Sequence, residues 1–263
     1  MQLNNFELLL LDNLIYVLKA DGEDYKERSL HYIISHLLYK DGIKTDKINS
    51  DNEEERKKHL GKIGEFYNND NTGKPQCGME LEEWIHVLQA IEKDENLCSL
   101  KIHDVTSEES SGFRAATFTS DTENIIIFKG TTEVEEWLDN GVGGYSVETP
   151  AQERALDYVN NLNLVNNNPF TVSGHSKGGN LAQYVTLFAS DPVIDKCLSF
   201  DGQGFSNEAC ETNEYKDAIK HNQDKMYMIS SSGDYVNVLF NSAILDKNKM
   251  YVKANPVGIS LVA

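Results

Sequence analysis

The chain has 263 residues, enough for one large domain or for a domain with an added subdomain. Forty per cent of the residues are hydrophobic, including 12 Tyr and 10 Phe, so the chain can bury a sizeable core. The formal net charge of −18 argues against nucleic acid and anionic lipid surfaces as partners, because both would be repelled. It does not exclude a lipid or neutral ester as substrate, because the polarity of a pocket is local.

The cysteines and the first residues indicate the cellular setting. The four cysteines are scattered without a C-x-x-C spacing, which predicts neither a disulfide framework nor a zinc site, and Cys197 reads as a buried thiol. The N-terminus lacks the basic flank of a signal peptide, and its apolar runs, separated by Asp12 and Asn13, are too short for a membrane span. We therefore expect a cytoplasmic protein without stable membrane insertion, with signal-independent export as the alternative.

The first 98 residues have the apolar spacing of helices. Residues 6–20 are apolar almost all round and predict a buried helix. Further helices are expected at residues 24–40, 52–67 and 81–91, the second of these being a charged, solvated helix with Glu53 and Lys57 placed for i,i+4 pairing. Residues 68–78 predict a loop that cannot bind calcium, because Met79 stands where a bidentate Glu is needed.

After Cys98 the pattern changes to strands that alternate with helices. Strands are predicted at residues 112–119, 124–129, 169–173, 196–200, 225–229 and 249–253. Helices are predicted at residues 133–139, 151–161, 207–219 and 236–244, besides the one that follows residue 176. This alternation indicates an α/β fold with a mostly parallel sheet. We expect a helical region, residues 1–98, packed on an α/β domain, residues 99–263.

The central motif is Gly174-His175-Ser176-Lys177-Gly178, between an apolar strand and an amphipathic helix. This context is typical of a nucleophilic serine on a strained strand-to-helix turn, which needs small residues two positions before and after it. The helix N-terminus favours a developing oxyanion, so the N–H of Lys177 is the expected donor. The pattern predicts Ser176 as the nucleophile of an ester hydrolase, against an ordinary glycine-rich turn as the alternative.

A serine nucleophile needs a base, and the base needs an orienting acid. Asp234 follows a predicted strand and is the preferred acid, with Asp201 after the preceding strand as the competitor. None of the seven histidines follows Asp234. His175 is expected to point away from the Ser176 hydroxyl. His221, at a predicted helix end, is the candidate substitute base, although a helix C-cap is its ordinary interpretation.

Residues 112–255 resemble the class 3, or fungal-type, lipases and their bacterial lipase-like relatives. The resemblance rests on three motifs in order, which are residues 127–131 with 137–139, residues 174–182, and residues 233–236. It implies an α/β-hydrolase fold, an oxyanion-hole donor at Thr131, and Trp137 in a segment leading into a lid over residues 132–145. Lys177 stands where leucine is commoner, and this departure is harmless because only its backbone N–H is needed.

The family's histidine follows the last strand, whereas this sequence stops at Ala263. Three explanations stay open: a chain that continues further, a substitute such as His221 or His103, or a pseudo-hydrolase that lacks the base.

Taken together, the motifs predict a serine hydrolase of lipid or other small carboxylic esters. It works through an acyl-enzyme and needs neither metal nor organic cofactor. A non-catalytic binding module is the alternative. A phosphate-binding P-loop is excluded, because G-x-x-x-x-G-K-[ST] is absent.

Overall fold

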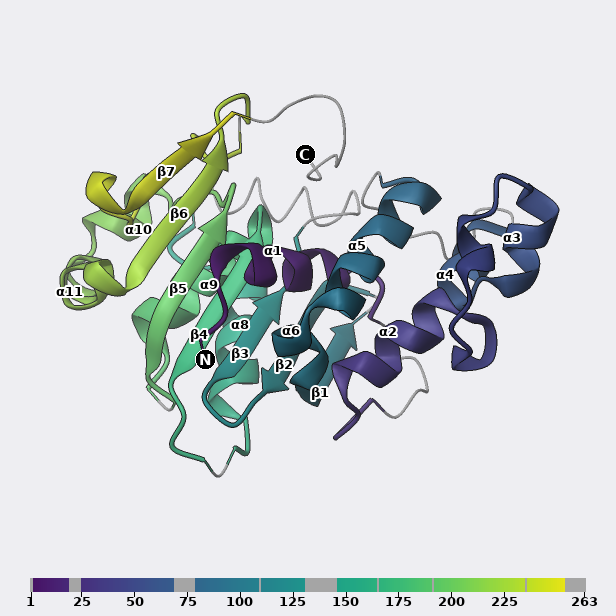
Figure 1. Ribbon diagram of the computed structural model, residues 1–263. Helices are drawn as coiled ribbons and strands as arrows, with labels where there is room; N and C mark the ends of the chain where they lie inside the picture. Colours follow the sequence, from purple (N-terminus) through teal and green to yellow (C-terminus); the bar gives the residue numbers. More distant parts are fainter. Residues whose placement is uncertain are drawn as a thin grey trace.

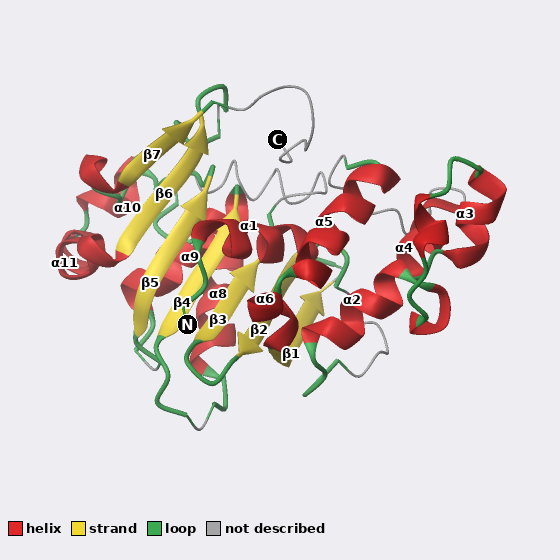
Figure 2. Cartoon of the chain, viewed as in Figure 1, coloured by secondary structure: helices red, strands yellow, loops and turns green. Residues whose placement is uncertain are grey.

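A computed structural model describes residues 2–18, 25–68, 79–108, 110–130, 146–164, 166–190, 192–234 and 236–253. Within these residues a seven-stranded sheet carries helices on both faces (Figures 1 and 2). The strands are β1 Lys101–Glu108, β2 Phe113–Thr119, β3 Asn124–Phe128, β4 Phe170–His175, β5 Ile194–Phe200, β6 Met226–Ser231 and β7 Lys249–Val252. The helices are α1 Asn5–Leu14, α2 Leu30–Leu38, α3 Glu53–His59, α4 Lys62–Asn68, α5 Leu81–Lys93, α6 Glu95–Ser99, α8 Pro150–Asn160, α9 Lys177–Phe188, α10 Asn207–Glu211 and α11 Asn213–Asn222. Short 3-10 turns are η1 Lys40–Gly42, η2 Asp46–Asn49, η3 Gln223–Lys225 and η4 Asp246–Asn248.

The strands lie side by side in their chain order, from β1 to β7. The pairs β1–β2 and β2–β3 are antiparallel, and every pair from β3 to β7 is parallel. The predicted α/β class with a mostly parallel sheet and flanking helices is therefore confirmed.

The strand order decides where the connecting helices lie. Parallel strands joined by a crossover almost always connect with right-handed geometry, so strands that advance in one direction place all their crossovers on one face. Helices α8, α9 and α11 accordingly share one apolar cluster with alternate residues of the strands, which include Val172 and Cys197. As predicted, the Cys197 thiol is buried, and burial raises its pKa to about 12.

The N-terminal helices cover the opposite face. Helices α1, α2, α5 and α6 share a second apolar cluster with the sheet, and they lie in front of it in Figure 1. Strand β3 shows why both layers are needed: Ile125 and Ile127 face the N-terminal helices, whereas Ile126 and Phe128 face α8 and α9. The prediction that this continuously apolar strand is covered on both faces is confirmed.

One strand was missed by the sequence analysis. Strand β1 pairs Ile102 with Phe118 but Asp104 with Thr117, so His103 is an extra residue in a β-bulge. The bulge places Ile102 and Val105 against the same apolar cluster although they are three residues apart. A period of two therefore does not hold along this strand, and the alternation that predicts strands is lost.

Two predicted helices are each divided in the structure. The charged segment 52–67 becomes α3 and α4, separated at Leu60 and Gly61, while the expected ion pair of Glu53 and Lys57 is present at 2.5 Å. The Gly61 N–H donates to Leu38 O at 3.0 Å, and a Cβ at Gly61 would lie 2.3 Å from His36 O. This backbone contact interrupts the helix. Segment 207–219 is likewise divided at Thr212, whose hydroxyl caps the next helix.

The predicted helix at residues 236–244 is wrong. Asn241 instead exchanges two backbone hydrogen bonds with Phe205, each of 2.8 Å, and Phe240 has a φ of 66°. A tertiary contact thus replaces the local helical bonds.

Helices α1 and α2 are shorter than the predicted segments 6–20 and 24–40. The predicted helix 133–139 lies outside the described residues, and no helix within the described ranges is long and apolar enough to cross a membrane.

Docking of α1 on the sheet can be tested by truncating a buried side chain. We expect Leu11→Ala, at a fully buried position of α1, to lower the free energy of unfolding by about 2–5 kcal/mol. The control is Ile43→Ala, at a side chain that is 70% exposed, and its effect should stay within about 0.5 kcal/mol. Urea denaturation of both variants measures the difference. Equal effects of the two substitutions would contradict the docked position of α1.

Candidate functional site

Ser176 lies at the turn between β4 and α9. Its backbone has φ 55° and ψ −121°, a conformation that is costly for a residue with a side chain. The Ser176 N–H donates to Phe200 O at 2.8 Å and its carbonyl accepts from Gly179 N at 3.0 Å, so both sides of the turn are fixed. Among the described residues, the Ser176 hydroxyl has no hydrogen-bond partner. A strained, firmly held serine with an uncommitted hydroxyl is the main feature of this site.

The glycines around Ser176 are required by close backbone contacts. A Cβ at Gly174 would lie 2.3 Å from the carbonyl carbon and oxygen of Gly178. A Cβ at Gly178 would in turn lie 2.1 Å from Phe128 O on β3. The predicted strand, turn and helix are present, and positions 174 and 178, two residues before and after the serine, leave no room for a side chain.

Buried amide side chains hold the first turn of α9 against its neighbours. Asn180 accepts from Gln152 Nε2 of α8 at 2.8 Å and donates to Gly204 O, in the loop after β5, at 2.7 Å. Gln183 donates to Ser199 Oγ and to Gly179 O, both at 3.2 Å. These contacts tie α8, α9 and the end of β5 into one rigid support for the turn.

Both predicted acids lie at the carboxyl edge of the sheet. Asp201 follows β5 with a φ of 48° and accepts from Ser231 N at 2.8 Å. Asp234, beyond β6, accepts from the backbone and side-chain amides of Asn237, both at 2.9 Å. Burial, together with the charge of Asp234, raises the pKa of Asp201 to about 6, although the hydrogen bond from Ser231 opposes the shift. The two carboxyl groups therefore influence each other.

His175 is the one histidine that the structure brings to these carboxyl groups within the described residues. Its Nε2 lies 4.0 Å from Asp201 Oδ2, and its buried Nδ1 has no hydrogen-bond partner among the described residues. Burial lowers the pKa of His175 to about 4, while the nearby charge of Asp234 opposes the shift. The ring is therefore neutral near pH 7, and it makes no hydrogen bond with Ser176 in the described structure.

The other histidines lie elsewhere. His221 is exposed in the last turn of α11, where its Nδ1 is 2.6 Å from Asp217 O. Helix α11 ends where β6 begins, at the opposite edge of the sheet from Ser176, so the structure does not bring His221 to the serine. His103 lies on β1, 3.8 Å from Glu27. Thr131 and Trp137, expected in the oxyanion hole and the lid, lie outside the described residues.

Helix α1 and the turn that follows it add two residues that the sequence did not indicate at the site. Asp12 Oδ2 accepts from Ser173 Oγ of β4 at 2.6 Å, and burial raises the pKa of Asp12 well above its ordinary value. One turn later, the Tyr16 hydroxyl lies 2.5 Å from the place that a Cβ of Gly130 would occupy, and Ser176 Cβ is 3.5 Å from the same place. A carboxyl group within the apolar run of α1 was the available signal for this contact.

Arg114 of β2 fixes the end of this helical segment. Its Nη1 donates to Ile15 O at 3.1 Å and to Tyr16 O at 3.0 Å. These carbonyls would otherwise be left without partners at the helix end. The side chain of Tyr16 is thereby held beside Gly130 and the serine turn.

A family model described as Mbeg1-like matches residues 92–260, which contain all seven strands of the sheet and its crossover helices. The chain belongs to the Mbeg1-like family. No curated protein matches the chain. The solved structures similar to it include a lipase of Rhizomucor miehei in its propeptide complex and lipase II of Rhizopus niveus.

These likenesses are distant. The Rhizomucor structure is 14% identical with a TM-score of 0.40, over 53% of this chain and 51% of the lipase, so this chain spans about half the length of that lipase. The Rhizopus lipase is 15% identical with a TM-score of 0.40, over 66% of this chain and 73% of the lipase. A triacylglycerol lipase of Penicillium expansum is 11% identical with a TM-score of 0.36, over 59% and 70%.

The strain at Ser176 predicts an unusual effect on stability. Ser176→Gly should raise the free energy of unfolding by about 1 kcal/mol, because glycine adopts a positive φ without steric cost. Ser176→Ala removes the same hydroxyl but keeps the Cβ, so it should not share the gain. Chemical denaturation of the two variants distinguishes these results. A glycine variant no more stable than the alanine variant would show that the turn is unstrained.

The buried His175 predicts a pH-dependent contribution to stability. Between its folded pKa of about 4 and its ordinary value of 6.5, the folded state binds fewer protons than the unfolded state, so stability falls as the pH is lowered. The raised pKa of Asp201 has the opposite effect in the same pH range, because it makes the folded state more stable as the pH is lowered. The comparison is made with His175→Asn, which lacks the imidazole. We expect the difference in free energy of unfolding, wild type minus variant, to fall by up to about 3 kcal/mol from pH 7 to pH 4.

Urea denaturation across this pH range is the measurement, and His31→Asn, at an exposed helical position, is the control. The control variant should follow the wild type at every pH. A constant difference between wild type and His175→Asn would show that the imidazole titrates normally in the folded state.

Proposed function

We propose that this chain carries an acyl-transfer site for carboxylic esters, with Ser176 as the nucleophile. The observation that carries the proposal is the backbone of Ser176, held at φ 55° between β4 and α9 by contacts that only glycine permits at residues 174 and 178. The strained backbone at this serine does not stabilise the fold. It does expose the serine hydroxyl above the sheet, where a nucleophile must lie. We infer a serine hydrolase of the lipase type that acts on lipid or other small esters.

The oxyanion of the tetrahedral intermediate would lie at the start of α9. In this proposal the N–H groups of Lys177 and Thr131 donate to it, and the positive end of the helix dipole adds to the stabilisation. Ser176 Oγ attacks the ester carbonyl, the alcohol leaves, and water then releases the acid from the acyl-enzyme. The resemblance to lipases assigns Trp137 to a lid segment over the site. No step requires a metal or an organic cofactor.

Asp234 is the proposed orienting acid, in preference to Asp201. The Asp234 carboxyl group is held in position by two hydrogen bonds that it accepts from Asn237. Burial raises the pKa of Asp201 to about 6, which makes it the poorer permanent anion. A carboxylate that orients a base must stay charged through the reaction.

The lack of a histidine hydrogen-bonded to Ser176 in the described structure favours a second candidate function. All seven histidines of the chain are described, and none hydrogen-bonds to Ser176 or to Asp234. A binding module that keeps the hydrolase fold without the base therefore remains the alternative. The two candidates differ in one property, which is the reactivity of Ser176 when a base is supplied.

Labelling with a fluorophosphonate, followed by peptide mass spectrometry, tests the proposal. Attack by Ser176 Oγ forms a phosphorus–oxygen bond, fluoride leaves, and the proton goes to the base. We expect the label on Ser176, no label in Ser176→Ala, and full labelling in the control Ser110→Ala, at an exposed turn. Asp234→Asn should slow labelling by about tenfold or more, and Asp201→Asn should slow it less.

Free imidazole distinguishes the two candidate functions. Where only the base is lacking, imidazole should raise the labelling rate of the wild type by about a hundredfold, the lower end of what a positioned base supplies, and leave Ser176→Ala unlabelled. A folded wild type that stays unlabelled with and without imidazole would refute the acyl-transfer proposal and support the binding module.

A further inference from the structure

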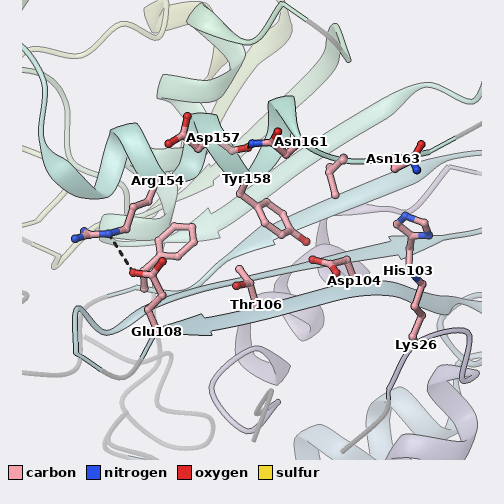
Figure 3. A pocket seen from close by; sticks show the side chains of 12 residues that line it. Lys26, His103, Asp104, Thr106, Glu108, Arg154, Asp157, Tyr158, Asn161 and Asn163 are labelled. Carbon is pink, nitrogen blue, oxygen red and sulfur yellow. Dashed lines mark hydrogen bonds and ion pairs between the residues drawn. The ribbon is translucent and has the colours of Figure 1, made fainter. Parts of the chain in front are cut away.

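A crevice of about 400 Å³ lies between strand β1 and helix α8, and its walls include neither Ser176 nor the two aspartates at the sheet edge. Figure 3 shows it with the side chains that line it. Strand β1 contributes Asp104, Thr106 and Glu108, and α8 contributes Arg154, Asp157 and Tyr158. Its volume is within the range of small-molecule sites.

The bulge at His103 decides which side chains enter the crevice. Because His103 is extra, Asp104 pairs with Thr117, whose hydroxyl is 2.7 Å from the Tyr158 hydroxyl on the α8 face. Thr106 and Glu108 follow on the same face by alternation. With regular pairing, Asp104 would share the face of Ile102, against the apolar core. Bulges at sheet edges commonly re-aim side chains in this way.

Within the described part of the chain, two carboxylates of the crevice have no cationic partner. Glu108 Oε2 is paired with Arg154 Nε at 3.1 Å, at one end of the crevice (Figure 3). At the other end lie Lys26 and His103, and His103 is 3.8 Å from Glu27. Among the described residues, no cationic side chain pairs with Asp104 or Asp157. The middle of the crevice is therefore negative.

The hydroxyl of Tyr158 points from α8 toward Asp104 (Figure 3). Burial raises the pKa of Tyr158 well above its ordinary value, and the charge of Asp104 acts in the same direction. The phenol is therefore neutral and offers its ring to the crevice. With Phe113 and Leu162 it makes an apolar wall beside the carboxylates. Aromatic faces beside carboxylates suit an organic cation.

A bare metal ion fits this place poorly. No group of three or more His, Cys, Asp or Glu side chains in the described ranges could hold a metal. A volume of about 400 Å³ also exceeds what one ion needs and instead accommodates an apolar body attached to the charge. An anionic ligand would be repelled by Asp104 and Asp157 and by a chain of net charge −18.

We propose that the crevice between β1 and α8 binds a small organic ammonium ion. The charged nitrogen contacts Asp104 beside the Tyr158 hydroxyl, and Asp157 at the rim adds attraction. The apolar body of the ligand lies along Tyr158, Phe113 and Leu162. This site is independent of the acyl-transfer proposal, because none of its residues contributes to the serine turn.

Three probes of one shape and different charge test the proposal by isothermal titration calorimetry at low salt. These are 2-phenylethylammonium, neutral 2-phenylethanol and anionic 3-phenylpropionate. We expect the ammonium ion to bind about tenfold or more tightly than the alcohol, because a charged hydrogen bond is lost in the alcohol, and the carboxylate to show no binding. Equal binding of the ammonium ion and the alcohol, or no binding of the ammonium ion, would overturn it.

Variants locate the binding. Asp104→Asn should weaken binding of the ammonium probe by about tenfold or more, whereas Asp121→Asn, at an exposed turn, makes the same charge change and should leave it unaltered. Thr106→Phe should fill the crevice and abolish binding without removing a charge. Ser176→Ala should bind like the wild type, which separates this site from the serine. Unchanged binding in folded Asp104→Asn and Thr106→Phe would place the probe elsewhere and refute the assignment.

Discussion

The rest of the structure depends on the one-directional order of its parallel strands. Because β3 to β6 advance across the sheet in a single direction, right-handed crossovers place α8, α9 and α11 on the same face. The other face carries apolar side chains of β3 and β5, such as Ile125 and Leu198, and would lie open to water. The N-terminal helices cover it, and this layer is therefore required by the topology of the sheet.

That requirement brings the N-terminal segment to the serine. Covering β3 and β4 places α1 against the strand that leads to Ser176, and Asp12 then meets Ser173. Tyr16, on the same side of the helical segment, lies beside Gly130. The family match begins at residue 92, yet residues from α1 form part of the surroundings of the site. A layer needed for burial thus also shapes the place where chemistry is proposed.

The serine turn and the crevice between β1 and α8 arise from different kinds of irregular backbone geometry. At the serine turn, positive φ at Ser176 is sustained by glycines packed against neighbouring backbone. At β1, one extra residue turns three polar side chains toward α8. In both cases a departure from regular geometry is held by neighbouring elements, and in both it directs a polar side chain away from the core. Regular strands and helices surround each of them.

The sequence by itself determined the α/β class and the strand, turn and helix around Ser176, because those features depend on local patterns of apolar residues and glycines. It also indicated Asp201 and Asp234 as strand-end carboxylates. Only the tertiary structure decided that β1 exists, that residues 236–244 pair with Phe205 instead of forming a helix, and that α1 reaches the serine. It likewise placed His221 at the far edge of the sheet and His175 beside Asp201. These outcomes depend on contacts between residues distant along the chain, which local periodicity does not encode.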